Sequence, residues 1–275
     1  MLTNNPDPSG IAIRAIESPR DLDACLDLQE MTWGKDFSEL VPPGILKIVQ
    51  KVGGIAAGAF DESDELVGFV FGISGVRNNK PAHWSHMLAV VPGHMNAGLG
   101  RKLKEYQRRR LLELEIGRMY WTFDPLVARN AHFNINRLGV SIEQYVEDMY
   151  GEGDRGKLDS IIGTDRFIAD WDLLGGNPRK PILIPDSFET VNSVFADGCP
   201  SPSTVRVTDD TPILVEIPED IGDVKLDSPT EAKAWRKNTR NALGTYLDRG
   251  YRVTGFARQP DTHRCMYELR KAADG

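Results

Sequence analysis

The stretch of sequence with the clearest chemical potential runs from Leu88 to Arg101. An apolar strand ends at Pro92, a short loop follows, and a long helix begins across Gly98-Leu99-Gly100. Glycines at a helix start leave backbone N–H groups uncovered, and the helix dipole adds partial positive charge to them. Such a turn can hold a phosphate or a pyrophosphate. A tight turn with a purely structural role is the alternative, and the spacing alone does not decide between the two.

Two other phosphate-binding motifs fit this stretch less well. A dinucleotide-binding unit needs Gly-x-Gly-x-x-Gly after its first strand and an acidic residue about twenty positions further on. After Gly98 and Gly100, the position at which that pattern requires its third glycine is occupied by Leu103. A P-loop is excluded because the chain contains neither Gly-Lys-Ser nor Gly-Lys-Thr.

Basic residues crowd the helix that follows the loop. They are Arg101, Lys102, Lys104, Arg108, Arg109 and Arg110. We expect most of them on a solvated face, balanced in part by Glu105 and Glu113, while one or two could meet a further phosphate of a bound cofactor. The formal net charge of −7 argues against a nucleic-acid-binding protein, whose affinity depends on neutralising phosphates.

The pattern of apolar residues predicts a mixture of helices and strands. Predicted strands cover 10–16, 54–60, 65–74, 83–91, 119–123, 164–173, 213–217, 251–258 and 265–269. Predicted helices cover a segment from a cap at Ser18 to near Gly34, then 43–52, 98–117, 128–138 and 229–249. A polar link at 61–64 predicts a hairpin turn. This order of elements indicates an α/β or α+β fold with a mixed sheet.

Composition places the chain among ordinary globular proteins, with 40% hydrophobic and 27% charged residues over 275 positions. No apolar run is long enough to cross a bilayer, and residues 1–10 lack the features of a secretory signal. We therefore expect a cytoplasmic protein that does not bind membranes. Cys25, Cys199 and Cys265 are scattered without metal-ligand spacing, so neither a disulfide framework nor a metal site is expected.

The loop and its flanks resemble the GNAT superfamily of N-acetyltransferases. Members carry a strand that ends in Leu-x-Val-x-Pro. The next segment starts with Arg or Gln and has a glycine three positions later and a glycine or alanine two positions after that. A helix with a leucine follows. The positions in register here are Leu88, Val90, Pro92, Gly98, Gly100 and Leu103. Met95 departs from the pattern, because the family usually has Arg or Gln there. The resemblance implies a mixed, mostly antiparallel central sheet flanked by helices, with acetyl-CoA or another acyl-CoA as co-substrate.

The resemblance also implies which residues bind the cofactor. The main chain of Leu88, Ala89 and Val90 would pair with the pantetheine arm. The pyrophosphate would lie against the loop and helix start formed by Met95, Asn96, Ala97, Gly98, Leu99, Gly100 and Arg101. Asn130 and Asn134, one turn apart on a later helix, would contact the pantetheine or the substrate.

Further motifs resemble a less characterised branch of predicted GNAT acetyltransferases. They are His86-Met87-Leu88, Lys104-x-x-Gln107-Arg108, 121–126, 130–139, Tyr145, Tyr150-Gly151, Asp165-Arg166-Phe167, Trp235-Arg236 and Gly250-Tyr251-Arg252-Val253. The coverage implies a catalytic domain at 1–175, a linker at 176–210 and a C-terminal α/β extension at 211–275 that packs on the catalytic domain. Members can occur near amino-acid racemases, which makes succinyl-CoA an alternative donor and an amino acid an alternative acceptor.

Acylation of an amine needs an unprotonated nucleophile, a thioester held beside it and a proton donor for the leaving thiolate. For the base we expect His86, on the cofactor strand, or Asp124, at the end of the next strand. The tyrosine that protonates the thiolate in many members is Ile135 here, so Tyr145 and Tyr150 are the candidate acids. No cysteine lies in the motif region, which argues against a cysteine acyl-enzyme.

Three functions are compatible with the sequence. The first is an acyl-CoA N-acyltransferase, using acetyl-CoA or succinyl-CoA, that acts on the amine of a small molecule such as an amino acid. The second is a non-catalytic acyl-CoA-binding module. The third, nucleic-acid binding through the basic helix, is disfavoured by the net charge. The expected partner is a small-molecule amine, and a homodimer is one arrangement that the sequence leaves open.

Overall fold

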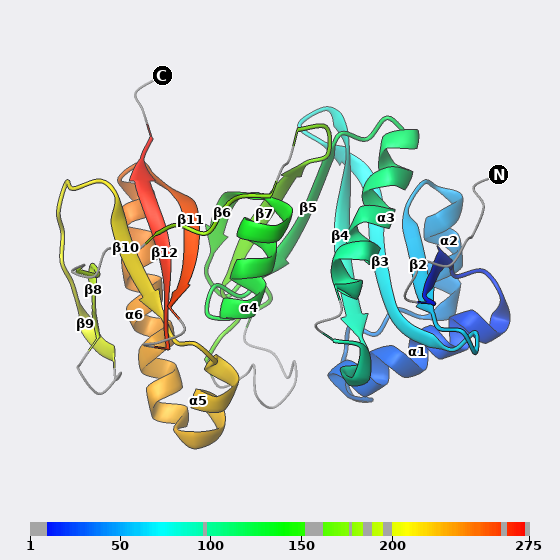
Figure 1. Cartoon of the computed structure of the whole chain (residues 1–275), viewed down its shortest axis with the longest axis horizontal. Coiled ribbons are helices and arrows are strands. Elements are labelled where there is room, and N and C mark those ends of the chain that lie inside the picture. Colours follow the sequence, from blue (N-terminus) through cyan, green and yellow to red (C-terminus); the bar gives the residue numbers. More distant parts are fainter. Residues whose placement is uncertain are drawn as a thin grey trace. The chain divides into compact units, whose positions relative to one another are not determined.

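The computed structural model of the chain describes residues 10–95, 98–151, 162–175, 178–183, 189–194, 200–259 and 263–272. The chain forms two compact units, whose elements are labelled in Figure 1. The first unit comprises Met1–Trp121 and Asp172–Gly175, and the second comprises Thr122–Trp171 and Gly176–Gly275. The three-part division at 175 and 210 expected from the sequence is a different one, and it stays a prediction.

The first unit is built on a mixed sheet in which strands β1 to β5 lie side by side in chain order. They span Ala12–Ala15, Ile55–Phe60, Leu66–Arg77, Lys80–Val90 and Arg118–Phe123. Strands β1 to β4 are antiparallel to their neighbours, and β5 is parallel to β4. The predicted hairpin turn at 61–64 is confirmed, because Asp61 Oδ1 accepts the backbone N–H groups of Ser63 and Glu65.

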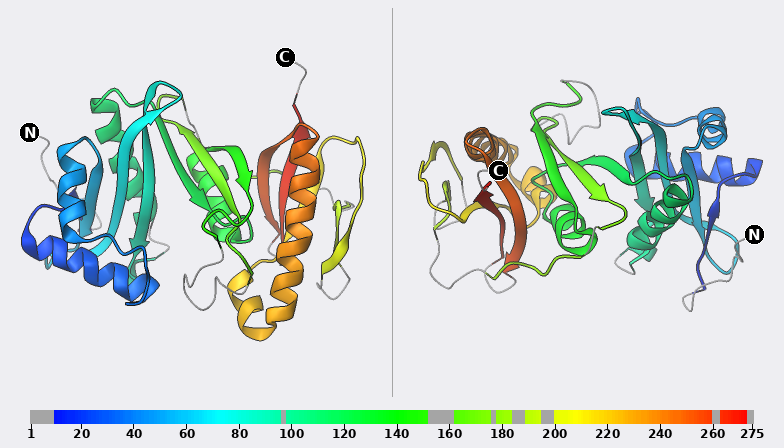
Figure 2. Two further views of the ribbon diagram at one scale, coloured as in Figure 1. Left: turned by 180° about the vertical axis from the view of Figure 1, so that it is seen from behind. Right: turned by 90° about the horizontal axis from the view of Figure 1, so that it is seen from above.

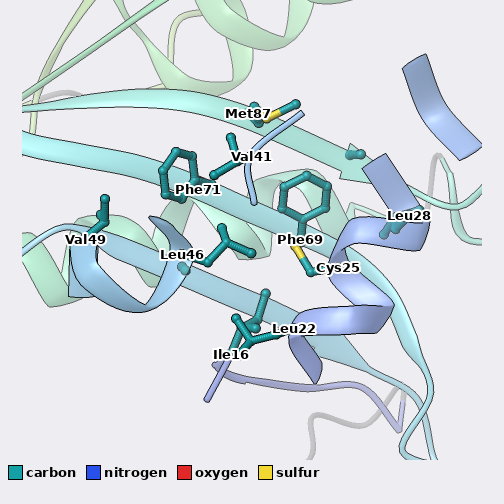
Figure 3. Close-up of a cluster of buried hydrophobic side chains, with 12 residues drawn as sticks. Ile16, Leu22, Cys25, Leu28, Val41, Leu46, Val49, Phe69, Phe71 and Met87 are labelled. Carbon is teal, nitrogen blue, oxygen red and sulfur yellow. The ribbon is translucent and has the colours of Figure 1, made fainter. Parts of the chain in front are cut away.

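Helices α1 (Pro19–Trp33) and α2 (Pro43–Lys51) cover one face of this sheet (Figure 2). Helix α1 begins as the sequence predicts, with the Ser18 hydroxyl accepting the N–H of Asp21. Figure 3 shows the apolar cluster that the two helices form with the strands. Its members are Ile16, Leu22, Cys25, Leu28, Val41, Leu46, Val49, Ala56, Phe69, Phe71, Met87 and Ala89. Burial raises the pKa of the Cys25 thiol to about 12, so this cysteine acts as an apolar packing residue.

Helix α3 (Leu99–Glu113) packs on the opposite face of the sheet (Figure 2). The apolar face predicted for it is confirmed at Leu99, Leu103 and Leu111, which are buried, and is wrong at Leu114, which was predicted on the same face and is 48% exposed. The prediction that the basic residues lie on a solvated face is wrong at one position, because Lys104 is only 4% exposed. Lys104 shares the inward stripe with Leu103, Gln107 and Leu111, at the three- and four-residue spacing that defines one face of a helix.

The second unit holds an antiparallel pair, β6 with β7, a three-stranded sheet ordered β10-β12-β11, and the pair β8 with β9. Its strands are Ser141–Val146 (β6), Arg166–Asp172 (β7), Asn192–Val194 (β8), Pro200–Val205 (β9), Ile213–Ile217 (β10), Tyr251–Gln259 (β11) and Arg264–Lys271 (β12). Its helices are Ala128–Ala131 (α4), Ile221–Asp227 (α5) and Pro229–Asp248 (α6). Trp235, Ala242 and Leu243 lie on the buried side of α6.

Most elements predicted for the second unit are confirmed. The strand at 213–217 is β10, the helix at 229–249 is α6, and the last two strands are β11 and β12. The helix predicted at 128–138 is α-helical only in α4 and continues as the π-helical segment His132–Leu138. Gly139 ends it with a φ of 73°, as expected for a C-terminal glycine. Strands β6, β8 and β9 and helix α5 carry no clear sequence signal and were missed.

The fold class expected from the sequence is confirmed, since the strand pairs are mostly antiparallel and helices flank the main sheet. Among the residues that the structure describes, no helix combines the length and the apolar character required to span a membrane.

Candidate functional site

Strand β4 carries the residues predicted to meet the pantetheine arm, and it is interrupted by a bulge. Phe71 of β3 pairs with Met87, and the next residue of β3, Gly72, pairs with Ser85. His86 is therefore an extra residue on β4 with no partner of its own on β3. A bulge of this kind bends the strand and re-aims nearby groups. Leu88, Ala89 and Val90 follow it directly.

The other neighbour of β4 accompanies it only briefly. Within the described residues, the parallel pairing of β4 with β5 joins His83 to Met119 and Trp84 to Tyr120. Ser85 and Trp121 are the next residues on the two strands, so this pairing ends beside them. A strand edge beyond such a point can form main-chain hydrogen bonds with an extended ligand, which is the property predicted for residues 88–90.

The start of α3 has the geometry of an anion site. Gly98 is its N-cap, with a φ of 77° in the left-handed region that favours glycine, and no side chain caps the helix. A Cβ atom placed on Gly98 would meet no atom of the described, non-adjacent residues within 4 Å. The first N–H bonded within the helix is that of Lys102, which donates to the Gly98 carbonyl. Among the described residues, the preceding N–H groups have no partner in the helix and are open to a ligand or water.

The remaining loop residues divide into those that are described and those that are not. The side chains of Met95 and Arg101 are exposed, and that of Leu99 is buried beneath the loop. Gly100 has Leu88 Cδ2 3.6 Å from the position of a Cβ atom, so helix and strand approach closely there. Asn96 and Ala97, which were predicted to hold the pyrophosphate, lie outside the described residues.

A pocket of about 380 Å³ lies beside this turn. Leu99 and Lys102 of α3, His94 of the preceding turn and the β2–β3 turn line it. Within the described part of the chain, His94 Nδ1 is buried and has no hydrogen-bond partner. Leaving such an atom unpaired costs about 1–3 kcal/mol, so a ligand or water in the pocket is expected to satisfy it. Asp61 and Glu62 of the β2–β3 turn also line this pocket, so its charge is mixed. The orphaned polar atom and the uncapped helix start are the groups in it that can bind phosphate oxygens.

His86, one predicted base, has an exposed side chain. Its ring packs edge-on against Phe71, with the ring centroids 6.2 Å apart. Partial desolvation lowers the pKa of the imidazole, and the opposing charge of Glu39, between α1 and α2, limits the effect. A lowered pKa keeps the imidazole neutral near neutral pH, which is the form that accepts a proton.

Asp124, the other predicted base, lies in the second unit and is held by arginines. Its Oδ2 accepts a hydrogen bond of 2.6 Å from Arg236 Nη2 and lies 3.8 Å from Arg166 Nη1. Its Oδ1 accepts the N–H of Leu126 at 2.8 Å. Both carboxylate oxygens are thus engaged within the protein. These contacts favour a role in fixing the turn after β5, and the role of Asp124 as a base stays a prediction.

The candidate acids also lie in the second unit. The Tyr145 hydroxyl donates to Asp165, a fully buried carboxylate that also binds Arg240. Burial and the adjacent charge of Asp165 raise the pKa of the Tyr145 phenol far above its usual value. A phenol in this state is a poor proton donor to a thiolate. The Tyr150 hydroxyl hydrogen-bonds Thr122 Oγ1 at 2.8 Å.

The two asparagines predicted to bind pantetheine lie on different kinds of helix. Asn130 is half-buried in α4, and Asn134 is buried in the π-helical segment that follows. π-Helical segments are rare and frequently lie at functional sites. Both residues belong to the second unit, whereas residues 86–101 belong to the first. Their roles stay predictions.

Sequence reasoning missed a buried polar cluster in the first unit. Its members are His83, Ser85, Lys104 and Gln107, which are buried, and Ser74, which is half-buried. A signal was available, because Lys104 and Gln107 are three residues apart on α3, and His83 and Ser85 are two apart on β4. Those spacings place each pair on one face of its element.

No protein-family model matches the chain, and no curated protein matches it either. Solved structures do resemble it. One is the NatC complex bound to a Gag peptide and CoA, at 12% identity and a TM-score of 0.47, covering 59% of this chain and 98% of the other. Another is a putative acetyltransferase of the GNAT family from Desulfovibrio desulfuricans, at 17% identity and a TM-score of 0.46, covering 59% and 99%.

A third similar structure is an aminoglycoside 6′-N-acetyltransferase complexed with coenzyme A. Its identity to this chain is 17% and its TM-score is 0.44, with coverage of 64% of this chain and 99% of the other. The likeness is one of fold.

Proposed function

We propose that this chain is an acyl-CoA-dependent N-acyltransferase, with acetyl-CoA as the donor and an amine as the acceptor. The observation that carries the proposal is the uncapped start of α3 at Gly98, which follows β4 directly and has a pocket at its side. Anionic groups bind such helix starts, and extended ligands bind strand edges. CoA has both features in one molecule, a pyrophosphate and an extended amide-containing arm.

In this proposal, the first-turn N–H groups of α3 and the loop at 95–97 hold the pyrophosphate. His94 Nδ1 meets a further polar group of the nucleotide. The arm then runs along β4 from Val90 towards the bulge at His86, four residues or roughly 13 Å of strand. That distance is comparable with an extended pantetheine arm, so the thioester reaches the bulge.

At the bulge, the neutral imidazole of His86 takes a proton from the acceptor amine as its nitrogen attacks the thioester carbonyl. Main-chain N–H groups of the bent strand polarise the carbonyl oxygen as negative charge develops on it. The C–S bond then breaks and CoA leaves as a thiolate, which requires a proton.

For the acceptor we propose the amine of a small molecule such as an amino acid. The amino terminus of a peptide is the alternative, and succinyl-CoA is the alternative donor. A non-catalytic acyl-CoA-binding module is the second candidate function, and two observations favour it. The proton of Tyr145 is held by Asp165, and Ile135 occupies the position of the usual acid.

The test is acceptor-dependent release of free CoA thiol from acetyl-CoA, measured with a thiol reagent across a panel of amino acids, amines and short peptides. Release that rises with one acceptor class and is lost in the His86→Gln variant supports the enzyme. Binding of acetyl-CoA without release for any acceptor supports the binding module, and no binding of any CoA species refutes both.

A further inference from the structure

A buried chain of hydrogen bonds crosses the first unit between α3 and the sheet. Lys104 Nζ lies 2.8 Å from Ser85 Oγ, and Ser85 Oγ lies 2.9 Å from Gln107 Oε1. Gln107 Nε2 lies 3.3 Å from His83 Nε2, and His83 Nδ1 lies 2.9 Å from Ser74 Oγ. Lys104, Gln107 and Ser85 are each at most 4% exposed.

Every donor in this chain points the same way. The Ser74 hydroxyl donates to the Gly53 carbonyl at 2.6 Å, so Ser74 Oγ accepts from His83 Nδ1–H. His83 Nε2 then accepts from the Gln107 amide, whose oxygen accepts from the Ser85 hydroxyl. Ser85 Oγ is left to accept from Lys104, which is the first donor in this series of hydrogen bonds.

Lys104 is an unusual residue at this position. Its ammonium group lies 3.8 Å from the centre of the Trp121 ring, and no ion pair joins it to a carboxylate within the described residues. Burial without a counter-ion lowers its pKa well below the usual value. An apolar side chain of similar length would cost the fold less. A buried ionisable group that weakens the fold is a candidate for function.

Lys104 lies where the pairing of β4 with β5 ends. It contacts Ser85 and Trp121, which follow the last paired positions of the two strands. Ser85 also precedes His86, the extra residue of the bulge. In the proposed function, on which this inference rests, the thioester sulfur lies at this bulge. The usual acid position of the resembled family is Ile135 here, and the proton of Tyr145 is held by Asp165.

We propose that Lys104 supplies the proton for the departing CoA thiolate, acting through the Ser85 hydroxyl. As the new C–N bond forms and the C–S bond breaks, the electron pair stays on sulfur. The Ser85 hydroxyl leaves its hydrogen bond to Gln107 Oε1 and gives its proton to sulfur, and Ser85 takes one from the Lys104 ammonium, which becomes a neutral amine. The proton that His86 removed from the acceptor goes to solvent, and solvent reprotonates Lys104. Ser85 is then the catalytic residue.

Lys104 is in this scheme a positioning residue and a proton source. The groups that face it are His83 and Ser85 from β4, Gln107 from α3 and Trp121 from β5. Of these only His83 titrates, and burial lowers its pKa to about 3. The limb on which kcat falls as pH rises, called here the alkaline limb, therefore reports on Lys104. An acid acts only while it is protonated, so kcat falls as pH rises through the pKa of Lys104.

The experiment compares Lys104→Met with Lys80→Met, which removes an exposed lysine at the start of β4. Three quantities are measured: acetyl-CoA affinity by calorimetry, kcat across the neutral and alkaline range, and Tm. For Lys104→Met we expect unchanged acetyl-CoA affinity and a kcat that falls by up to about a hundredfold. The alkaline limb should disappear, and Tm should rise because a buried charge is gone. Lys80→Met should match the parent protein throughout.

Two further variants complete the test. Ser85→Ala should lower kcat as Lys104→Met does, and the double variant should be no slower than either, because the two residues act in one step. Unchanged kcat in Lys104→Met, a retained alkaline limb, additive losses, or a lowered Tm with activity lost in proportion to unfolding would each overturn the proposal. Absence of acetyl-CoA binding in the parent protein would instead refute the proposed function.

Discussion

Replacing Gly98 with alanine tests the start of α3 as an anion site. At a φ of 77° an alanine costs about 1–2 kcal/mol relative to glycine. In the part of the chain that the structure describes, no atom of a non-adjacent residue lies within 4 Å of the new methyl group, so no packing clash with these residues adds to the cost. The methyl group would project beside the first-turn N–H groups. Losing one hydrogen bond to a charged ligand costs about 1.5–3 kcal/mol, so the Kd for CoA should rise roughly 10- to 150-fold.

The matched control is Gly250→Ala in the second unit. Gly250 has a φ of 85°, and a Cβ there also meets no atom within 4 Å. This variant should lose about the same stability as Gly98→Ala and bind CoA as the parent protein does. Isothermal titration calorimetry gives the two Kd values and urea unfolding gives the two stabilities. Parent-like CoA affinity in Gly98→Ala, or an equal loss of affinity in both variants, would refute the reasoning.

Three further predictions concern individual side chains. His83 has a pKa of about 3 in the folded protein against an ordinary value of 6.5, so between these two pH values the unfolded chain binds a proton that the folded protein does not. The free energy of unfolding is therefore intact above the ordinary pKa and falls by up to about 4–5 kcal/mol as pH approaches the folded pKa. Urea titrations should find this loss missing in His83→Gln. Removing Arg240 leaves the buried carboxylate of Asp165 short of a partner, so Arg240→Gln should cost the second unit about 2–4 kcal/mol after allowance for the partial exposure of the arginine. The exposed Lys237→Gln on the same helix should cost under about 0.5 kcal/mol, and equal denaturation midpoints for these two would contradict the account. His86→Gln should lower kcat by about a hundredfold or more and abolish the acidic limb of the pH profile while acetyl-CoA affinity is kept; a retained acidic limb would remove His86 from the mechanism.

Local patterns in the sequence were sufficient to place the elements that carry the cofactor loop. Alternating apolar residues predicted β4, and the glycines at Gly98 and Gly100 predicted where α3 begins. These features depend on neighbours within a few residues, and the structure reproduces them. Gly98 is the clearest case, since its left-handed φ is the conformation that a glycine at a helix start permits.

The candidate site was less predictable, because it depends on contacts far apart in the chain. Charge alone placed Lys104 on a solvated face, yet the docking of α3 on the sheet buries it against Ser85, 19 residues away. Asp124 read as a free base at a strand end, but its partner Arg236 is 112 residues further along. No local pattern reports either contact.

The most direct test of the central claim is thermal unfolding with CoA, acetyl-CoA, succinyl-CoA and NADH, each at a concentration far above its expected Kd. A ligand at about a hundred times its Kd stabilises the folded protein by about 2.7 kcal/mol, which should raise Tm by roughly 5–10 °C for a chain of this size. The account predicts such a shift with the CoA species and none with NADH. No shift with any CoA species, or an equal shift with NADH, would contradict it.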